Sequence, residues 1–253
     1  MIHPHTELRQ VSPEVGLGVV ATRFIPRGTI LWIDCPLDQK LTPQEVASLA
    51  PEYRAVLDRY GYPDLQGRTV LCWDHGRFVN HSCDPSAASG PLTQCEVALK
   101  DIHPGEQFTC EYLEIRSPDT FPCQCGAATC RGMVRWEDRE QVEARLHSLV
   151  EEVLPLIAEV EQPLAAYAKH LPEVQALVAG EPLSRPTLKE VAEAAAKNGA
   201  AKGAKNGAAK GAKNGAAKGA AKNGAAKKTT TRKNGAAKKA DPVAADRPRA
   251  RAR

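Results

Sequence analysis

Three cysteines crowd into eight residues of the chain, as Cys123-Gln-Cys125-Gly-Ala-Ala-Thr-Cys130. Thiolate sulfurs at such spacing can surround one ion, and four ligands complete the tetrahedral site that Zn²⁺ prefers. The segment around them has almost no apolar side chains, so it has little reason to fold other than a metal. The spacing therefore predicts a structural zinc site with three of its four ligands identified.

The fourth ligand is expected from upstream, because no Cys or His follows Cys130 until His147. It would tie the cysteine-rich segment back onto the body of the protein. Cysteines that bind no metal are expected to be buried as small apolar residues. Of the eight cysteines, spacing alone leaves five candidates for the fourth ligand: Cys35, Cys72, Cys83, Cys95 and Cys110.

Three further segments carry residue types that bind ligands or do chemistry. They are Gly16-Leu17-Gly18, Asn80-His81 with Cys83 close behind, and Gly105-Glu-Gln-Phe-Thr-Cys-Glu-Tyr112. Taken singly each signal is weak, since such glycine pairs and Asn-His pairs occur in many turns and a tyrosine that ends a strand usually belongs to the core. Their order along the chain, followed by Cys-x-Cys-x4-Cys, is far more specific.

In this order the segments resemble the SET-domain protein lysine methyltransferases that carry a post-SET zinc motif. The resemblance covers residues 9 to about 136. It implies an α+β, mostly β fold of small curled sheets, in which the segment through Asn80 and His81 threads beneath the loop after Tyr112 as a pseudo-knot. Threaded chains are rare among protein folds. The resemblance also implies methyl transfer from S-adenosylmethionine to a lysine amine of a protein substrate.

The resemblance further implies roles for single residues at the cofactor. Gly16, Leu17 and Gly18 match a loop whose backbone approaches the cofactor, which the missing Cβ of glycine allows. Asn80 and His81 match the pair that holds the cofactor through backbone and side-chain hydrogen bonds.

Tyr112 matches the tyrosine whose hydroxyl faces the transferring methyl group, and it is the predicted catalytic residue as well as a cofactor contact. A lysine amine has an ordinary pKa near 10.4, and a narrow apolar channel beside a sulfonium lowers that pKa, so that the amine becomes a nucleophile without a dedicated base. For the metal, the resemblance selects Cys83 as the fourth ligand beside Cys123, Cys125 and Cys130.

Three positions depart from the family pattern. Ser86 stands where an Asn usually ends the middle motif, and no Tyr lies near Asp34, where relatives often place one in the wall of the cofactor site or channel. Cys110 occupies a position where Phe or Tyr commonly limits the number of methyl groups. Because its side chain is smaller, Cys110 is expected to belong to the catalytic site and to leave room for di- or trimethylation.

The elements that would position these residues are mostly short strands between Leu8 and Arg116. Two similar segments, 21–31 and 98–108, each consist of an extended run, a Pro/Gly turn and a second extended run, which predicts a hairpin or sharp corner. Residues 42–60 are expected to be helical, with Thr42, Pro43 and Glu45 forming the helix start.

Helical spacing of apolar residues continues over 137–179, where three prolines divide it, and a third patch covers 188–196. The predicted domains are a SET domain at 9–116, a post-SET zinc segment at 117–136, a helical extension at 137–196 and a tail at 197–253.

Charge is divided unevenly between body and tail. The 253-residue chain has a net charge of +4, but residues 197–253 hold 17 Lys and Arg against Asp241 and Asp246, which gives the tail +15 and leaves −11 for 1–196. The tail repeats Lys-Asn-Gly-Ala-Ala-Lys-Gly-Ala and cannot bury enough apolar surface to order itself, so it is expected to be disordered in isolation. Like the tails of linker histones, such a polycation is expected to bind DNA without sequence preference. Alternatives are a solubilising extension and a tail whose own lysines are methylated.

No run of residues is apolar enough to cross a bilayer, and the N-terminus lacks a signal pattern. The protein is therefore expected to be intracellular, in cytoplasm and nucleoid if bacterial or in nucleus and chromatin if eukaryotic. The predicted function is S-adenosylmethionine-dependent lysine methylation of a basic, DNA-associated, histone-like protein, with one structural zinc. The alternative is a non-catalytic chromatin or nucleoid scaffold with a SET-like body.

Overall fold

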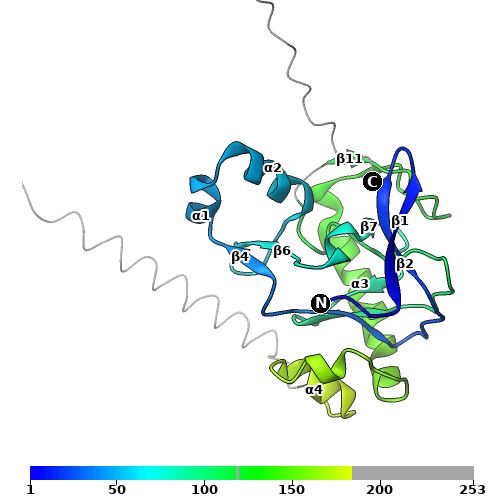
Figure 1. Ribbon diagram of the computed structural model, residues 1–253. Coiled ribbons are helices and arrows are strands. Elements are labelled where there is room, and N and C mark those ends of the chain that lie inside the picture. Colours follow the sequence, from blue (N-terminus) through cyan, green and yellow to red (C-terminus); the bar gives the residue numbers. More distant parts are fainter. Residues whose placement is uncertain (118–119, 184–253) are drawn as a thin grey trace, which may run out of the picture. The chain divides into compact units, whose positions relative to one another are not determined.

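The structure, a computed structural model, describes residues 1–117 and 120–183 (Figure 1). The predicted helical patch at 188–196 and the basic tail at 197–253 lie outside the described residues.

The strands are short, as the sequence predicts. They are β1 (Thr6–Ser12), β2 (Gly16–Ala21), β3 (Ile30–Ile33), β4 (Gln39–Leu41), β5 (Tyr62–Pro63), β6 (Thr69–Leu71), β7 (Asn80–His81), β8 (Ala87–Ala88), β9 (Cys95–Ala98), β10 (Thr109–Cys110), β11 (Phe121–Pro122) and β12 (Met133–Val134). Within the described ranges these strands form small sheets of two or three strands each, in the orders β1-β2, β10-β7, β11-β12, β3-β9-β8 and β4-β6-β5.

Helices lie in the insert after β4 and in the C-terminal part of the described chain. They are α1 (Pro43–Ser48), α2 (Pro51–Tyr60), α3 (Arg139–Val153) and α4 (Pro172–Val178), with 3₁₀ helices η1 (His75–Phe78), η2 (Trp136–Asp138), η3 (Leu154–Ala158) and η4 (Ala165–Tyr167). A mostly β body followed by short helices divided at prolines is thus confirmed.

The two similar segments of the sequence pair with each other. The backbones of Ile25 and Ile102 exchange two hydrogen bonds of 2.9 Å, and Gly28 and Gly105 turn the chain at φ values of +89° and +88°. Because the left-handed region favours glycine, these two positions fix where each segment turns. The early and late parts of the body are therefore joined by one antiparallel contact between matching corners.

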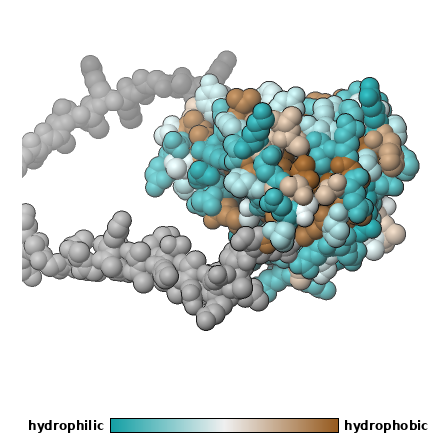
Figure 2. All heavy atoms as spheres, turned by 90° about the horizontal axis from the view of Figure 1, so that it is seen from below, coloured by the Kyte–Doolittle hydropathy of each residue, from teal (hydrophilic) through white to brown (hydrophobic). Residues whose placement is uncertain are grey.

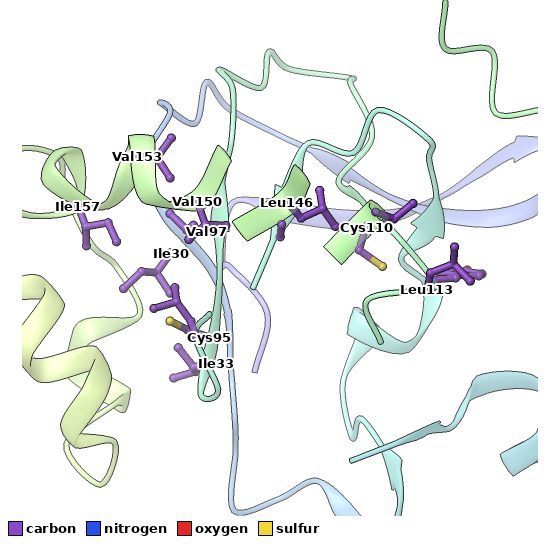
Figure 3. Close-up of a cluster of buried hydrophobic side chains, with 14 of the residues drawn as sticks. Ile30, Ile33, Cys95, Val97, Cys110, Leu113, Leu146, Val150, Val153 and Ile157 are labelled. Atoms are coloured by element: carbon purple, nitrogen blue, oxygen red, sulfur yellow. The ribbon is translucent and has the colours of Figure 1, made fainter. Parts of the chain in front are cut away.

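The core lies between the β3-β9-β8 sheet and α3. Figure 3 shows Val150, Val153 and Ile157 directed toward Ile30 and Val97 from the facing strands. The helical residues among them are fully buried, which is the apolar stripe expected from their spacing. The C-terminal helices thus complete the core of the body.

One glutamine fastens the C-terminal segment to the body. The Gln162 side chain accepts from the N–H of Ile30 at 2.8 Å and donates to the carbonyls of Gly28 and Ile157, each at 2.9 Å. Gly28 itself leaves no room for a Cβ, which would lie 2.7 Å from the Cβ of Leu156. The turn at Gly28 is therefore held by residues that lie more than a hundred positions later in the chain.

The insert begins as predicted and then divides. Thr42 and Glu45 form a complete capping box at the start of α1. The predicted single helix is broken between α1 and α2, where Leu49 and Ala50 are extended before Pro51. A residue that precedes proline is disfavoured in the helical region, which explains the break.

The face seen in Figure 2 carries apolar patches among polar side chains. Among the described helices, none combines the length and the apolar character that a membrane span requires.

Candidate functional site

The site is built around the parallel pairing of β7 with β10. Asn80 lies opposite Thr109, and His81 lies opposite Cys110. Just beyond β10 the hydroxyl of Tyr112 donates to the carbonyl of Val79 at 3.0 Å. The predicted proximity of the Asn-His segment to Tyr112 is therefore present.

Asn80 connects this pairing to the early glycine loop. Its Nδ2 donates to the carbonyl of Leu17 at 3.2 Å and to Oε1 of Gln107 at 3.0 Å. A Cβ on Gly18 would lie 2.6 Å from that Nδ2, so the glycine is required for the loop to approach. At Gly16 the reason is different: φ is +83° and nothing lies within 4 Å of an added Cβ. The backbone of the loop is thus open to a ligand at Gly16 and closed against the body at Gly18.

The His81 ring is enclosed in the body. Its Nδ1 accepts from the backbone N–H of Tyr112 at 3.3 Å, and its Nε2 lies 3.4 Å from Sγ of Cys83. The ring packs between Tyr112 and Phe121, with centroids 5.3 and 5.4 Å away. Nδ1 also lies 3.4 Å from Oε1 of the buried Glu111, so both ring nitrogens face partners inside the protein. The side chain is therefore committed within the protein.

The four predicted zinc ligands lie together. Sγ atoms of Cys83, Cys123, Cys125 and Cys130 are all within 4.8 Å of one another. Sulfurs placed about 2.3 Å from a shared tetrahedral centre would be about 3.8 Å apart. Cys83 and Cys123 show this separation of 3.8 Å, which is far too long for a disulfide. The donor set and its spacing thus fit a tetrahedral metal.

Backbone groups support the cysteine cluster. Cys83 N–H donates to Sγ of Cys125 at 3.4 Å, and Arg131 N–H donates to Sγ of Cys83 at 3.5 Å. Although burial raises the pKa of Cys125, hydrogen bonds from Cys83 and Ala127 outweigh it and hold that pKa at about 7. One thiolate is therefore favoured near neutral pH even before a metal binds.

The other cysteines considered for the fourth ligand lie outside this cluster. Cys35, Cys72, Cys95 and Cys110 are all buried, as expected for small apolar residues. Burial raises the pKa of Cys72 to about 12, so this side chain stays a neutral thiol.

A buried ion pair lies near the cluster, and no pattern in the sequence predicted it. Arg131 donates to Glu111 at 2.7 Å, and the Glu111 side chain is completely buried. Burial raises the pKa of Glu111 while Arg131 opposes the shift. Because Glu111 precedes Tyr112, this pair joins the cysteine-rich segment to the loop that carries the predicted catalytic residue.

A cavity of about 760 Å³ opens beside Tyr112 and Cys110. Its walls come from the insert, from β9 and from α3, and include the aromatic side chains of Trp32, Tyr62 and Phe108. Cys110 is buried at its edge, consistent with its expected place near the reacting groups.

Two carboxyl groups line the same cavity. Burial raises the pKa of Glu96 to about 8, and the neighbouring charge of Glu114 raises it further. Burial also raises the pKa of Glu114 to about 7, although the N–H groups of Gly90 and Ser89 hydrogen-bond to its Oε1. Neither residue was predicted to belong to the site, since each is a single acid in a short segment.

The two remaining departures have clear structural roles. Ser86 accepts from the N–H of Thr109 at 2.9 Å, and its own N–H donates to the Thr109 hydroxyl at 3.1 Å. It thereby fastens the middle motif to β10. Asp34 forms an ion pair with Lys40 at 2.6 Å, and both line the cavity. The wall where relatives often carry a tyrosine is therefore an ion pair in this chain.

Comparisons with known proteins agree with this arrangement. Residues 16–113 match the family described as SET domain. The fold of the body is accordingly the SET fold, with small sheets and few helices.

Curated relatives of the SET domain include two histone-lysine N-methyltransferases. Set2 of Drosophila melanogaster is 31% identical over an alignment of 134 residues, and the match covers 48% of this chain and 6% of that protein. The histone-lysine N-methyltransferase of Cryptococcus neoformans described as H3 lysine-4 specific is 42% identical over 65 residues, 22% of this chain and 4% of that protein. The chain therefore spans a small fraction of the length of these relatives.

Among solved structures, the methyltransferase domain of human histone-lysine N-methyltransferase SETMAR aligns over 54% of this chain and 59% of that chain. The identity is 21% and the TM-score is 0.39.

The raised pKa of Glu96 predicts how stability depends on pH. The folded carboxyl keeps its proton up to a pH of about 8, whereas the unfolded one loses it near 4.5, so stability falls as pH rises through this window. Glu114 and the amino group of Met1 are the charges that act on it. We expect Glu96→Gln to raise stability at pH 8.5 by at least ~1 kcal/mol, or roughly 2–4 °C in Tm, and to change it little at pH 5. Thermal unfolding at both pH values measures this, with the exposed Glu161→Gln as control. A uniform shift at both pH values would contradict the assignment.

Proposed function

We propose that this protein is an S-adenosylmethionine-dependent protein-lysine N-methyltransferase that acts on a basic protein. The observation that carries the proposal is the meeting of three distant segments at Asn80 and His81. Asn80 holds the loop of Gly16 to Gly18, His81 pairs beside Cys110, and Tyr112 bonds to Val79. The histone-lysine methyltransferase names of the relatives support the same activity.

The loop at Gly16 and the backbone of the Asn80–His81 segment are the groups that would hold the cofactor. Gly16 fits this role because its open face lets a ligand reach the backbone. When bound, S-adenosylmethionine supplies an electrophilic methyl group on a sulfonium.

The protein's own residues act on the lysine in three ways. The hydrogen bond to Val79 fixes the direction of the Tyr112 hydroxyl, and its oxygen would orient the amine and the methyl group. Aromatic walls of the cavity remove water from the lysine tip, which lowers the pKa of its ammonium. The buried Cys110 gives the amine space to rotate after the first methyl group is added, and we propose that di- or trimethylation is accessible.

The cluster of Cys83, Cys123, Cys125 and Cys130 is proposed as a structural Zn²⁺ site within a post-SET segment at 117–136. All four ligands come from the protein, which leaves no position for a substrate, as in structural rather than catalytic zinc sites. Its task would be to hold the cysteine-rich loop against Glu111 and Tyr112.

The substrate is proposed to be a basic, histone-like protein. The net charge of −11 on residues 1–196 favours a basic partner over an acidic one. The lysines of the tail at 197–253 are a second source of the same chemistry. Such a substrate would place the protein in the cell's DNA compartment, whether nucleus or nucleoid.

Replacement of Tyr112 by Phe tests the assignment of the active site. We expect Tyr112→Phe to lower methyl transfer by about 100-fold, because the hydroxyl that orients the reacting groups is lost. The measurement is intact mass after incubation with cofactor, alone and with a histone mixture. Tyr167→Phe is the matched control, since Tyr167 is 58% exposed. The same spectra count methyl groups, and a strictly monomethylated product would contradict the role given to Cys110.

A scaffold without activity is the competing function. It predicts no mass change in the wild-type protein in either incubation, together with no binding of cofactor by calorimetry. That pair of results would reject the methyltransferase, whereas cofactor binding with no transfer to the histone mixture would reject only the substrate class.

Substitution of a cluster cysteine tests the metal. We expect the wild type to hold one zinc per chain and Cys130→Ser to lose most of it, since a tetrahedral site with three thiolates is incomplete. Cys35→Ser, outside the cluster, should keep the metal. Elemental analysis gives the stoichiometry, and thermal unfolding with and without a chelator should show a lower Tm only where zinc was bound. Equal zinc in both variants would disprove the site.

The tail is proposed to bind DNA through its charge. Its net +15 neutralises phosphates and releases counterions, which makes affinity fall steeply with salt. Deletion of 197–253 should abolish salt-sensitive DNA binding and leave cofactor affinity unchanged. A tail of the same length with its Lys and Arg residues replaced by Gln is the control. Retained DNA binding in that variant would show that charge is not the cause.

A further inference from the structure

The cavity beside Tyr112 contains two carboxyl groups that the protein leaves without a cation. Oε1 of Glu114 is fixed by the N–H groups of Ser89 at 3.0 Å and Gly90 at 2.5 Å, while its Oε2 is buried with no hydrogen-bond partner in the described chain. The carboxyl of Glu96 has no hydrogen bond or ion pair within the same described ranges. Buried polar groups are normally satisfied, so this pair needs an explanation.

The third member of the group is Trp32. It is paired with Glu96 across the antiparallel strands β3 and β9, so both side chains stand on the same face of the sheet. Its indole Nε1 is also buried and lacks a partner in the described part of the chain. An aromatic face beside a carboxylate attracts cations, through the ring quadrupole and through charge.

Five basic side chains line the cavity; Arg116 and His147 form no ion pair with either acid within the described residues, and the other three are bound elsewhere. Lys40 is bound to Asp34 at 2.6 Å and Arg68 to Asp64 at 2.7 Å. Arg77 lies within 3.4 Å of the carbonyl of Cys72 and stands over the Phe78 ring. The carboxyl pair is thus the part of the wall whose charge is not balanced by a side-chain ion pair.

We propose that Glu96, Glu114 and Trp32 form a subsite that binds a second cationic side chain of the substrate, a lysine ammonium or arginine guanidinium close in sequence to the target lysine. This inference rests on the proposed methyltransferase function. The target amine itself is a poor occupant, because carboxylates beside it would stabilise its ammonium form and oppose transfer. A neighbouring residue that remains charged gains from the same carboxylates.

The raised pKa values of Glu96 and Glu114 give the subsite a pH signature. Near pH 7 the pair still holds a proton, and a bound cation favours its release. Affinity for a substrate with two cations should therefore rise between pH 6 and 9. Trp32 and Tyr62 line the cavity beside these acids. The charged groups around the pair are the Met1 amino group, Glu111 and the cavity residues Asp34, Lys40, Asp64, Arg68, Arg77, Arg116, Glu143 and His147.

Two peptides distinguish binding at this subsite from binding through the other substrate contacts. One has the sequence of residues 197–212 of this chain, which holds Lys197, Lys202, Lys205 and Lys210. The other keeps Lys205 and carries Gln at the remaining three. Each is titrated by calorimetry into wild type and into Glu96→Gln, Glu114→Gln and the control Glu161→Gln. Glu to Gln keeps the shape of the side chain, and thermal unfolding verifies that each variant is folded.

For the four-lysine peptide we expect about 10- to 100-fold weaker binding to Glu96→Gln and Glu114→Gln and no change in Glu161→Gln. The one-lysine peptide should bind the wild type and the variants alike. In transfer assays the loss should be in KM, with kcat within about twofold. Equal losses for both peptides, no loss for either, or no binding of the four-lysine peptide at millimolar concentration would overturn the subsite. A fall in kcat at unchanged KM would also overturn it, because the acids would then act on proton transfer.

Binding and transfer also keep the two proposals apart. If the peptide effects appear in calorimetry while no methyl group is transferred to any substrate, the subsite stands and the enzymatic function fails. If transfer occurs but the peptides do not discriminate among the variants, the function stands and the subsite fails.

Discussion

The buried imidazole of His81 connects the cysteine cluster to the segment that carries Tyr112. His81 accepts from the backbone of Tyr112 on one nitrogen and faces the sulfur of Cys83 with the other. Neither contact can be exchanged for water, because the ring is enclosed by Tyr112 and Phe121. A residue in the two-residue strand β7 thereby couples the proposed metal cluster to the proposed catalytic loop. Such a short strand has little stability of its own, so its position depends on these side-chain bonds.

The other residue of β7, Asn80, connects the loop of Gly16 to Gly18 to the site. Asn80 is adjacent to His81 and directs its amide toward Leu17 and Gln107. Neighbouring residues in an extended segment point to opposite sides, so one step along β7 separates the contacts with the loop of Gly16 to Gly18 from those with the cysteine cluster. The Glu111–Arg131 pair adds a second connection to that cluster, and breaking it would leave a buried charge uncompensated. The cysteine cluster, the loop of Gly16 to Gly18 and Tyr112 are therefore linked through side chains of β7 and of the segment that follows β10.

Sequence patterns predicted those parts of the site in which residue type and order carry the information. The cysteine spacing identified three members of the cluster, and only the family resemblance added Cys83, since nothing in its spacing distinguishes it from Cys35 or Cys95. Helical spacing and prolines predicted the C-terminal helices because each proline interrupts the hydrogen-bond ladder locally. The proximity of Glu96, Glu114 and Trp32 was not predicted. It depends on the register of β3 against β9 and on the loop that contains Ser89 and Gly90, and both are long-range properties. The contact of the two Pro/Gly corners was missed for the same reason, since each corner alone reads as a local hairpin.

Alternation along one strand explains how the core and the cavity are joined. In β9, Cys95 and Val97 are buried in the cluster packed against α3, while Glu96 between them lines the cavity. In β3, Ile33 enters the same core, and Trp32 faces the cavity beside Glu96. Since side chains of a strand alternate between its faces, the packing of α3 on one face fixes the depth at which Trp32 and Glu96 stand on the other. The apolar packing of α3 on one face thus sets the geometry of the charged wall on the other face of the sheet, and a one-residue slip of β9 would place the carboxyl in the core.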